Sequence, residues 1–238
     1  MTLKTGAILV VGANGSFGEC LLQELRRKYP HTSLFGTTRR FEPTKADFTV
    51  YAPDLTEGGC STLQNQLEQH LRKHNLHLDM IYLVAASACP TSRLTPDRIQ
   101  EMYTVNRDMV KWWGTQYPTV PMVFISTSAV YGTKGTVSLE CYSDSKRQGE
   151  AAFLASTTKA PRIIVRFTQV YTNFLTRAGM DKETSFSPLI AISPEKAAQK
   201  VVREVLKKRT LILVGWATKV LDFLHNIDPT YAQVFMRL

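Results

Sequence analysis

Cysteine is scarce in this chain, and long apolar runs and internal repeats are absent. Only 4 of the 238 residues are Cys, at positions 20, 60, 89 and 141, and no two form a Cys-x-x-Cys pair. A disulfide scaffold and a cysteine-built zinc site are therefore not expected. No run approaches the roughly 18 apolar residues of a membrane-spanning helix, and a strand pattern begins where a signal peptide would lie. We expect a cytoplasmic protein with no integral membrane segment.

A long basic tail and a nucleic-acid-binding signature are missing too, although the formal net charge is +9. The basic residues form short clusters at 26–28, 39–40 and 207–209, far apart in the sequence. The first and third clusters are typical of solvated helix faces and turns, so no nucleic-acid partner is expected. Hydrophobic residues make up 44% and charged residues 21%, a globular balance. We expect a single domain spanning residues 1–238.

Short apolar, β-branched runs alternate with amphipathic stretches along the whole chain. The runs predict strands at 7–11, 33–37, 48–52, 80–84, 122–127, 162–167 and 211–214. The amphipathic stretches predict helices at 17–29, 61–74, 96–117, 142–157 and 194–207. Continuous apolar strands that alternate with helices indicate a parallel sheet covered on both faces. The sequence therefore predicts an α/β fold: a Rossmann-type, doubly wound parallel sheet of about seven strands.

Two segments fall outside this alternation. Residues 171–193 form a long irregular stretch, which we interpret as a substrate lid or loop. Residues 216–238 read as a C-terminal tail of two helices, 217–227 and 229–238, with Asp228 as the N-cap between them. An apolar stripe runs along the tail at helical spacing. We expect this stripe to pack on the body or on a second subunit, because it lacks the Lys/Arg-rich face of a membrane-surface helix.

A glycine-rich loop follows the first predicted strand directly and opens the first predicted helix. It reads Gly12-Ala13-Asn14-Gly15-Ser16-Phe17-Gly18. Glycines at this place permit a tight turn and close approach of the backbone to a pyrophosphate, which the free N–H groups of the helix N-terminus attract. The position between strand and helix predicts a dinucleotide site. The spacing is GxxGxxG, whereas the standard fingerprint is GxGxxG.

The residues at the end of the second predicted strand indicate which nicotinamide dinucleotide binds, NAD or NADP. An acidic residue there accepts a hydrogen bond from the ribose of NAD, whereas arginine attracts the 2′-phosphate of NADP. The sequence has Thr38-Arg39-Arg40 at this place, with no acidic residue before Glu42. NADP(H) is therefore the predicted cofactor. Asp54-Leu55, after the third strand, is a candidate contact for the adenine, although an Asp before a helix is commonly a cap.

Candidate catalytic residues follow the fifth predicted strand. Tyr142 and Lys146 are four residues apart on a predicted helix and so share one face. A nearby ammonium favours the ionised phenol, whose unperturbed pKa is near 10. Ser128, at the end of the strand, precedes Tyr142 and is the preferred hydroxyl, with Ser126 and Thr127 as neighbouring alternatives.

These motifs together resemble the short-chain dehydrogenase/reductase family over about residues 7 to 206. The ordered set is Gly12-x-x-Gly15-x-x-Gly18, Asp54-Leu55, Val84-Ala85-Ala86, Asn106, Ser128 and Tyr142-x-x-x-Lys146. The resemblance implies that Tyr142 donates or accepts the proton and that Lys146 lowers its pKa and binds the nicotinamide ribose. Ser128 would polarise the substrate carbonyl and Asn106 would support a proton relay, while Ala85 and Ala86 would line the cofactor. The expected enzyme is an NADP(H)-dependent oxidoreductase that acts on a carbonyl, alcohol or imine-like small molecule.

Several motifs depart from the compact members of that family. The glycine spacing, the run 83–86 and the segment 166–171 are similar to the longer branch, which includes sugar epimerases and dehydratases. An epimerase or dehydratase is therefore an alternative, although only roughly 70 residues follow the sixth strand. A regulatory NADP-binding protein without turnover is a third hypothesis. We expect no metal, because His70, His74 and His77 lack further ligands nearby, and we expect a homo-oligomer, either a dimer or a tetramer.

Overall fold

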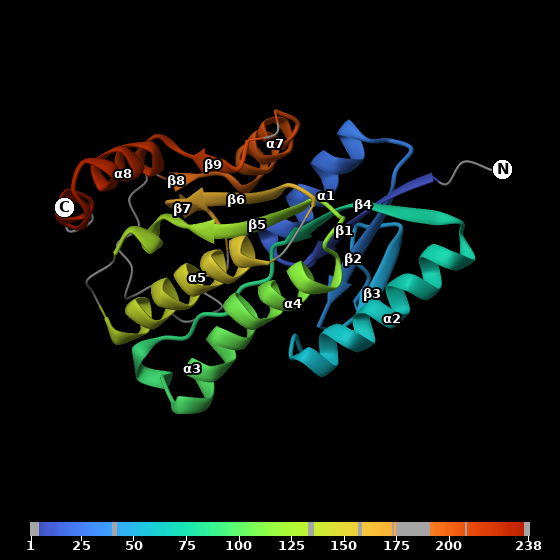
Figure 1. The fold of residues 1–238 in the computed structure, drawn as a ribbon, viewed down its shortest axis with the longest axis horizontal. Coiled ribbons are helices and arrows are strands. Elements are labelled where there is room, and N and C mark those ends of the chain that lie inside the picture. Colours follow the sequence, from blue (N-terminus) through green and yellow to red (C-terminus); the bar gives the residue numbers. More distant parts are fainter. Residues whose placement is uncertain are drawn as a thin grey trace.

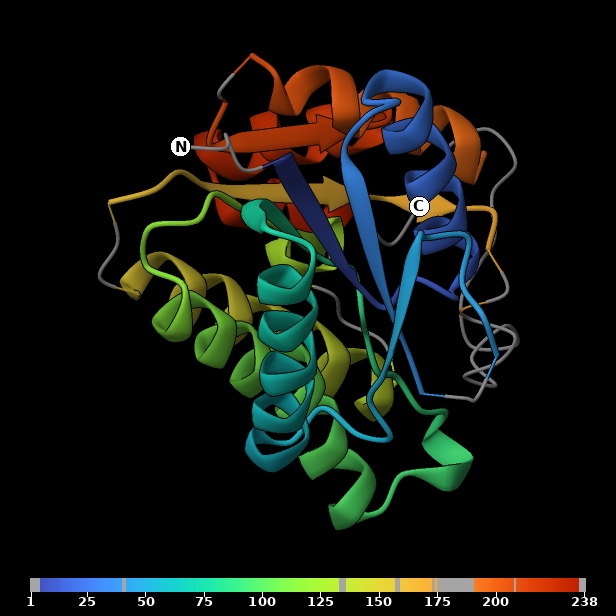
Figure 2. The same ribbon diagram turned by 90° about the vertical axis from the view of Figure 1, so that its right-hand side faces the viewer.

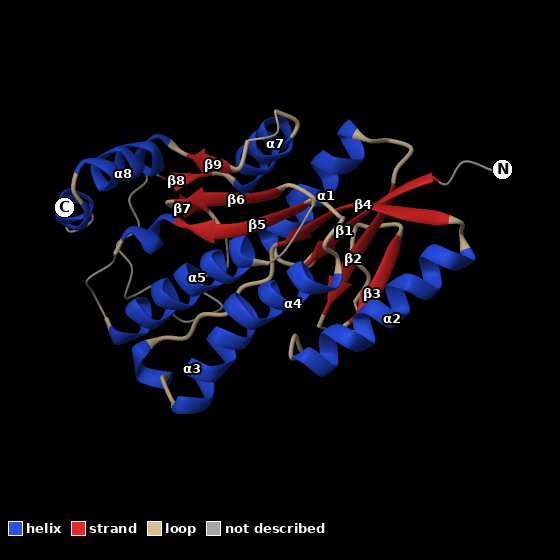
Figure 3. Ribbon diagram, viewed as in Figure 1, coloured by secondary structure: helices blue, strands red, loops and turns tan. Residues whose placement is uncertain are grey.

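Seven parallel strands form the central sheet, in the order β3-β2-β1-β4-β5-β6-β9 (Figures 1 and 3). The computed structural model describes residues 5–39, 42–132, 136–156, 159–172, 174, 191–207 and 209–235. The strands are β1 (Thr5–Val11), β2 (Ser33–Thr38), β3 (Phe48–Tyr51), β4 (Leu76–Leu83), β5 (Met122–Thr127), β6 (Arg162–Phe167) and β9 (Leu211–Val214). The order reverses between β1 and β4, which is where such folds hold their ligands. The predicted α/β fold is confirmed.

Helices cover both faces of the sheet and enclose two separate cores (Figure 2). One face carries α1 (Ser16–Lys28) and α7 (Pro194–Val205), which pack against each other. The other face carries α2 (Glu57–Lys73), α4 (Met109–Gln116) and α5 (Val137–Ala155). Because every central strand contributes apolar side chains to both faces, its sequence lacks the alternation of a half-exposed strand. The two cores therefore share the sheet as a common wall.

Hydroxyl side chains fix where the helices begin. Thr56, Thr136 and Ser193 each accept a hydrogen bond from the backbone N–H three residues further on. These caps satisfy N–H groups that would otherwise lack an acceptor. They start α2 at 57 and α5 at 137, earlier than the predicted starts at 61 and 142, because apolar periodicity alone does not mark the first polar turn.

The predicted helix 96–117 contains a π-helical segment. It divides into α3 (Pro96–Tyr103), η2 (Thr104–Asp108) and α4. Asn106 lies inside η2 and is completely buried. Single π turns inside helices occur frequently at functional sites, because they alter the direction of the side chains locally.

The predicted lid lies largely outside the described residues, which resume at 191. The short strand β7 (Gln169–Val170), just before the predicted lid, pairs in parallel with β8 (Ala191–Ile192) near its end, and the sequence did not predict this pair. In the tail, α8 (Trp216–Ile227) and α9 (Pro229–Phe235) confirm the two predicted helices. No helix in the described ranges is long and apolar enough to cross a membrane.

Candidate active site

The three glycines of the loop occupy positions with different steric requirements. Gly12 has a φ of +91°, and a Cβ there would lie 2.6 Å from the backbone nitrogen of Ala85. A Cβ on Gly18 would collide with the carbonyl oxygen of Gly12, so α1 can approach β1 only without one. Gly15 is the N-cap of α1 and makes no side-chain hydrogen bond, and a Cβ there would lie in ordinary van der Waals contact, 3.6 Å from the carbonyl oxygen of Gly12. The glycine loop at this helix N-terminus suits an anionic group.

The end of β2 holds the glycine loop in place. Gly12 donates its backbone N–H to Thr37 Oγ1 at 2.9 Å, and Asn14 Nδ2 donates to Thr38 Oγ1 at 2.8 Å. Ala13 N–H donates to the carbonyl oxygen of Thr37 at 3.1 Å. Two of the predicted cofactor-binding residues, Asn14 and Thr38, therefore fix each other at the switch point of the sheet.

Arg39 follows β2 and is exposed, as a residue that binds a ligand phosphate must be. Its guanidinium lies 4.0 Å from a carboxylate oxygen of Glu101 on α3. Its neighbour Arg40 lies outside the described residues. Asp54 Oδ1 accepts hydrogen bonds from the backbone N–H and the hydroxyl of Thr56, the N-cap of α2, at 3.0 and 2.6 Å, and the contact of Asp54-Leu55 with the adenine stays a prediction.

Asn106 fixes the loop that follows β4. Its Oδ1 accepts the backbone N–H of Ser87 at 3.1 Å, while its Nδ2 donates to the carbonyl oxygen of Ser87 at 2.8 Å and to Ser145 Oγ at 3.0 Å. The side chain thus fixes Ser87, which follows Ala86 and lies two residues after Ala85, the residue that faces Gly12. In this structure Asn106 is a positioning residue, and its predicted part in a proton relay stays a prediction.

Three hydroxyls lie at the end of β5, and each has a different environment. Ser126 Oγ is buried without a hydrogen-bond partner in the described part of the chain. Thr127 caps the short helix η3 (Ser128–Tyr131) by accepting from the backbone N–H of Ala129 at 3.2 Å. Ser128 is buried at the first position of η3. Ser128 and its two alternatives are therefore consecutive residues, and the choice of Ser128 as the catalytic hydroxyl stays a prediction.

Tyr142 and Lys146 lie in the second and third turns of α5, which packs on η3. Ser143 Oγ donates to the carbonyl oxygen of Ala129 at 2.6 Å, and this bond fixes the two elements together. Burial raises the pKa of the half-buried Tyr142. The Tyr142 ring faces Phe174, with ring centroids 6.1 Å apart. The phenol therefore keeps its proton at neutral pH.

Lys146 is almost completely buried, and its ammonium donates to the carbonyl oxygen of Ile125 at 2.9 Å. It also lies 4.7 Å from the ring centroid of Phe124. Burial lowers the pKa of Lys146 to about 7, against a smaller opposing effect of Glu150. No hydrogen bond joins Lys146 to Tyr142 within the described residues, so the predicted lowering of the phenol pKa by Lys146 stays a prediction.

A buried ionic cluster next to Lys146 was not predicted from the sequence. Glu150, one turn after Lys146, accepts two hydrogen bonds from Arg166 of β6 at 2.6 and 3.0 Å. Arg166 also lies 3.7 Å from Asp222 of α8, which accepts the hydroxyl of Tyr131 at 2.5 Å. Ion pairs of this kind form only when the folded chain brings α5, β6 and α8 together. No local sequence pattern could therefore have predicted them.

The histidines lie away from this site. The rings of His70 and His74 stack near Phe48, and His77 Nε2 lies 2.6 Å from Asp79 Oδ1. In the described ranges His, Cys, Asp and Glu nowhere gather in threes that could hold a metal ion.

The sheet order, the glycine loop and the Tyr142–Lys146 turn define an α/β protein of the short-chain dehydrogenase/reductase class. The family model for the NAD dependent epimerase/dehydratase family matches residues 8–236. The chain belongs to this family. A comparison with curated proteins finds no match.

Solved structures of short-chain dehydrogenases share the fold. One from Streptomyces avermitilis aligns with a TM-score of 0.69 and 17% identity, over 98% of this chain and 96% of that chain. One from Burkholderia cenocepacia, in complex with NADP, aligns with a TM-score of 0.68 and 13% identity over 97% and 96%. A 3-ketoacyl-(acyl-carrier-protein) reductase from Brucella melitensis, complexed with NADH, gives 0.66 and 15% over 90% and 98%. The predicted resemblance is confirmed.

Proposed function

We propose that this chain is an NADP(H)-dependent oxidoreductase that transfers hydride between the nicotinamide and a carbonyl, alcohol or imine-like small molecule. The observation that carries the proposal is the shared position of the glycine loop, η3 and the Tyr142–Lys146 turn. The loop follows β1 and η3 follows β5, and the ends of parallel strands meet at one edge of the sheet. The glycine loop proposed to hold the cofactor and the η3 turn that packs against the Tyr142 helix therefore lie at the same edge of the sheet.

The residues at this edge fit a dinucleotide. The N-terminus of α1, which follows the glycine loop, suits the pyrophosphate, because the first N–H groups of a helix lack acceptors within it. Arg39 and Arg40 follow β2, where a 2′-phosphate would need cations. Ala85 would close the opposite side. When bound, the nicotinamide supplies or accepts the hydride, which no side chain of this chain can do.

Tyr142 acts as the acid in reduction under this proposal. Its raised pKa keeps the proton on Oη at neutral pH, and it passes that proton to the substrate oxygen as the carbonyl carbon gains the hydride. Ser128 donates a second hydrogen bond to the same oxygen, so that the developing negative charge meets two positioned donors. Lys146, buried one turn after Tyr142 on α5, holds the cofactor ribose and favours the phenolate that the proton transfer leaves.

Cofactor preference tests the role of the arginines. We expect NADPH to bind more tightly than NADH, and the joint change Arg39→Ala and Arg40→Ala to abolish that preference, because the 2′-phosphate then lacks its cations. Cofactor fluorescence titration measures both affinities. Arg72→Ala, an exposed arginine on α2, is the matched control. Equal binding of the two cofactors by the unmodified chain would contradict the NADP assignment.

Turnover tests the role of Tyr142. We expect Tyr142→Phe to lower the rate of NADPH oxidation over a panel of ketones, aldehydes and imines by about 100-fold or more, because general acid catalysis is lost. The hydroxyl alone is removed, so NADPH affinity should change little. Tyr29→Phe, at the end of α1, is the control. Undiminished turnover in Tyr142→Phe would refute the proposed acid.

A nucleotide-sugar epimerase or dehydratase is the second candidate, favoured by the family to which the chain belongs. Such an enzyme returns the cofactor to its starting state. Sugar conversion without net NADPH oxidation would select this candidate over the oxidoreductase. Tight NADPH binding without any turnover would instead favour a regulatory protein. The cytoplasmic location and the homo-oligomeric state stay predictions.

A further inference from the structure

A carboxylate of α3 reaches the residue that follows β2. Glu101 Oε1 lies 4.0 Å from the guanidinium of Arg39. Its other oxygen, Oε2, accepts a hydrogen bond at 2.6 Å from Arg98, three residues earlier on α3. Oε1 also accepts the hydroxyl of Ser87, in the loop after β4, at 3.5 Å. Glu101 therefore connects the end of β2 to the loop that follows β4.

This connection lies at the edge of the sheet where the dinucleotide is proposed to bind. β2 and β4 are the two neighbours of β1 in the sheet, and the glycine loop follows β1. Because the three strands are parallel, their carboxyl ends lie side by side at one edge. The contacts of Glu101 therefore run from one neighbour of β1 to the other, at the edge that carries the glycine loop.

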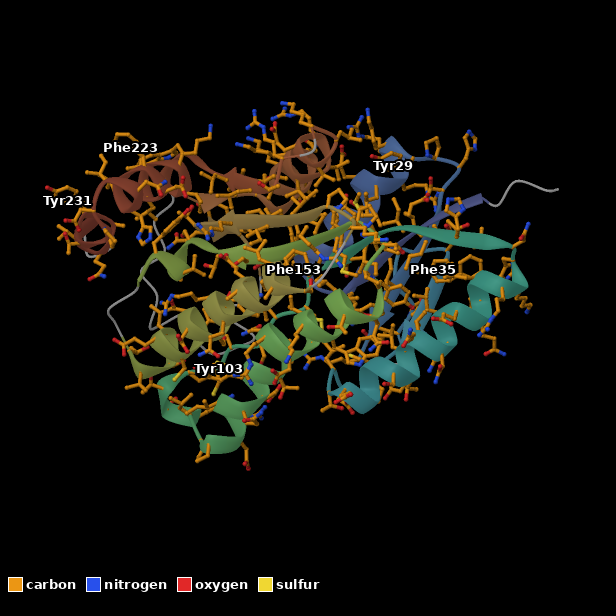
Figure 4. The ribbon with its side chains drawn as sticks, viewed as in Figure 1. Tyr29, Phe35, Tyr103, Phe153, Phe223 and Tyr231 are labelled. Carbon is orange, nitrogen blue, oxygen red and sulfur yellow. The ribbon has the colours of Figure 1, made fainter. Side chains whose placement is uncertain are left out.

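The helix that carries Glu101 is anchored to the body of the protein. Tyr103 of α3 faces α5 (Figure 4), where its hydroxyl donates a hydrogen bond to Asp144 Oδ2 at 2.6 Å. The side chain of Glu101 is 36% exposed, whereas that of Arg39 is 63% exposed. The carboxylate is therefore the more constrained partner of the pair, and the guanidinium is the partner that a ligand can reach.

A phosphate group can displace the carboxylate from Arg39. Exposed ion pairs are weak, because water and salt screen both charges. A phosphate monoester carries more negative charge than a carboxylate and offers three acceptor oxygens, so it forms stronger hydrogen bonds with a guanidinium. Glu101 and a 2′-phosphate at the end of β2 would therefore compete for the same guanidinium.

We propose that Glu101 sets how strongly the chain prefers NADP(H) over NAD(H), by competing with the 2′-phosphate for Arg39. Glu101 is a positioning residue: it holds the guanidinium until the phosphate displaces it. NAD(H) has an uncharged hydroxyl at this position and does not need the cation, so Glu101 weakens the binding of NADP(H) alone. This inference rests on the proposed cofactor site at the end of β2, and it does not depend on turnover.

A double-mutant cycle on cofactor affinity tests this competition. We expect Glu101→Gln to tighten NADPH binding about threefold at low ionic strength and to leave NADH binding unchanged. In an Arg39→Ala background the same change should have almost no effect, because the guanidinium for which the carboxylate competes is gone. Raising the ionic strength from about 20 to about 300 mM should reduce the effect of Glu101→Gln, because salt screens exposed charges. Cofactor fluorescence titration measures every affinity.

Glu68→Gln is the matched control. Glu68 also forms an ion pair with an exposed arginine, Arg72, at 3.9 Å. Both residues lie in the last turns of α2, which leads into the start of β4, at the edge of the sheet opposite the glycine loop. The control change removes the same charge from the same kind of pair, and it should alter the affinity for neither cofactor.

The possible results separate this inference from the proposed cofactor preference. NADPH affinity that Glu101→Gln leaves unchanged or lowers would overturn the inference, and so would a gain that persists in the Arg39→Ala background. Equal binding of NADPH and NADH by the unmodified chain, with tighter binding of NADPH alone by Glu101→Gln, would contradict the NADP assignment and support the inference. If neither the unmodified chain nor Glu101→Gln binds NADPH, both are wrong.

Discussion

At the scale of single residues, Lys146 carries an ionisable group in a buried, poorly hydrated environment. A buried ammonium with one carbonyl acceptor has lost most of its hydration. The face of Phe124 and the carboxylate of Glu150 replace only part of it. Burial lowers the pKa of Lys146 to about 7, so the side chain is a weaker base in the folded chain than in the unfolded one. Such strain is typical of a group kept for function.

This shift predicts that stability rises with pH. Between pH 7 and 9 the unfolded chain keeps the Lys146 proton while the folded chain releases it, so the unfolding free energy increases with pH, by at most about 1.4 kcal/mol per pH unit. Urea unfolding of the cofactor-free chain at several pH values measures this slope. Lys146→Met should remove it and stabilise the chain most at pH 7, whereas the exposed Lys111→Met should leave it unchanged. A slope that survives in Lys146→Met would contradict the assignment.

Asn106 shows why a residue's type does not fix its role. The sequence placed an asparagine in a helix at the right distance, and its side chain could have faced solvent. The π-helical turn of η2 instead points it at Ser87, where it satisfies a backbone donor and acceptor together. Gly149 allows this, because a Cβ there would collide with the carbonyl oxygen of Asn106. A single π turn does not alter the apolar period, so the sequence could not reveal it.

At the scale of elements, the sequence predicted those features that are determined by residues close together along the chain. The strands, the glycine loop and the Tyr142–Lys146 turn follow from local patterns, and the parallel order follows from alternation. The starts of α2 and α5 were predicted late, because the threonine caps at 56 and 136 precede the apolar pattern. The short β7–β8 pair was missed, because two-residue strands leave no periodic signal.

Contacts between distant elements set the limit of that prediction. Arg166 contacts Glu150, sixteen residues earlier, and Asp222 on α8. Tyr131 contacts Asp222 across ninety-one residues. These charges tie η3, the turn that carries Ser128, to the C-terminal tail. The sequence predicted the tail helix but not that Arg166 and Tyr131 contact Asp222 on it. These contacts form only after folding has brought β6 and η3 near α8.

At the scale of the whole molecule, the shared sheet and this ionic tie predict one cooperative unfolding transition that includes the tail. In urea, the unfolding curve followed by far-ultraviolet circular dichroism should coincide with two fluorescence curves. One is that of a Trp216→Phe variant, which reports on the core through Trp112 and Trp113, and the other is that of the unmodified chain, which adds α8. Asp222→Asn should move all three curves together, by about 1–3 kcal/mol, because Tyr131 and Arg166 lose a charged partner. Asp97→Asn, an exposed carboxylate in the first turn of α3, controls for the change of charge. If the tail were a separate unit, Asp222→Asn would shift only an early transition seen by Trp216, and the expectation of a single domain over 1–238 would be wrong.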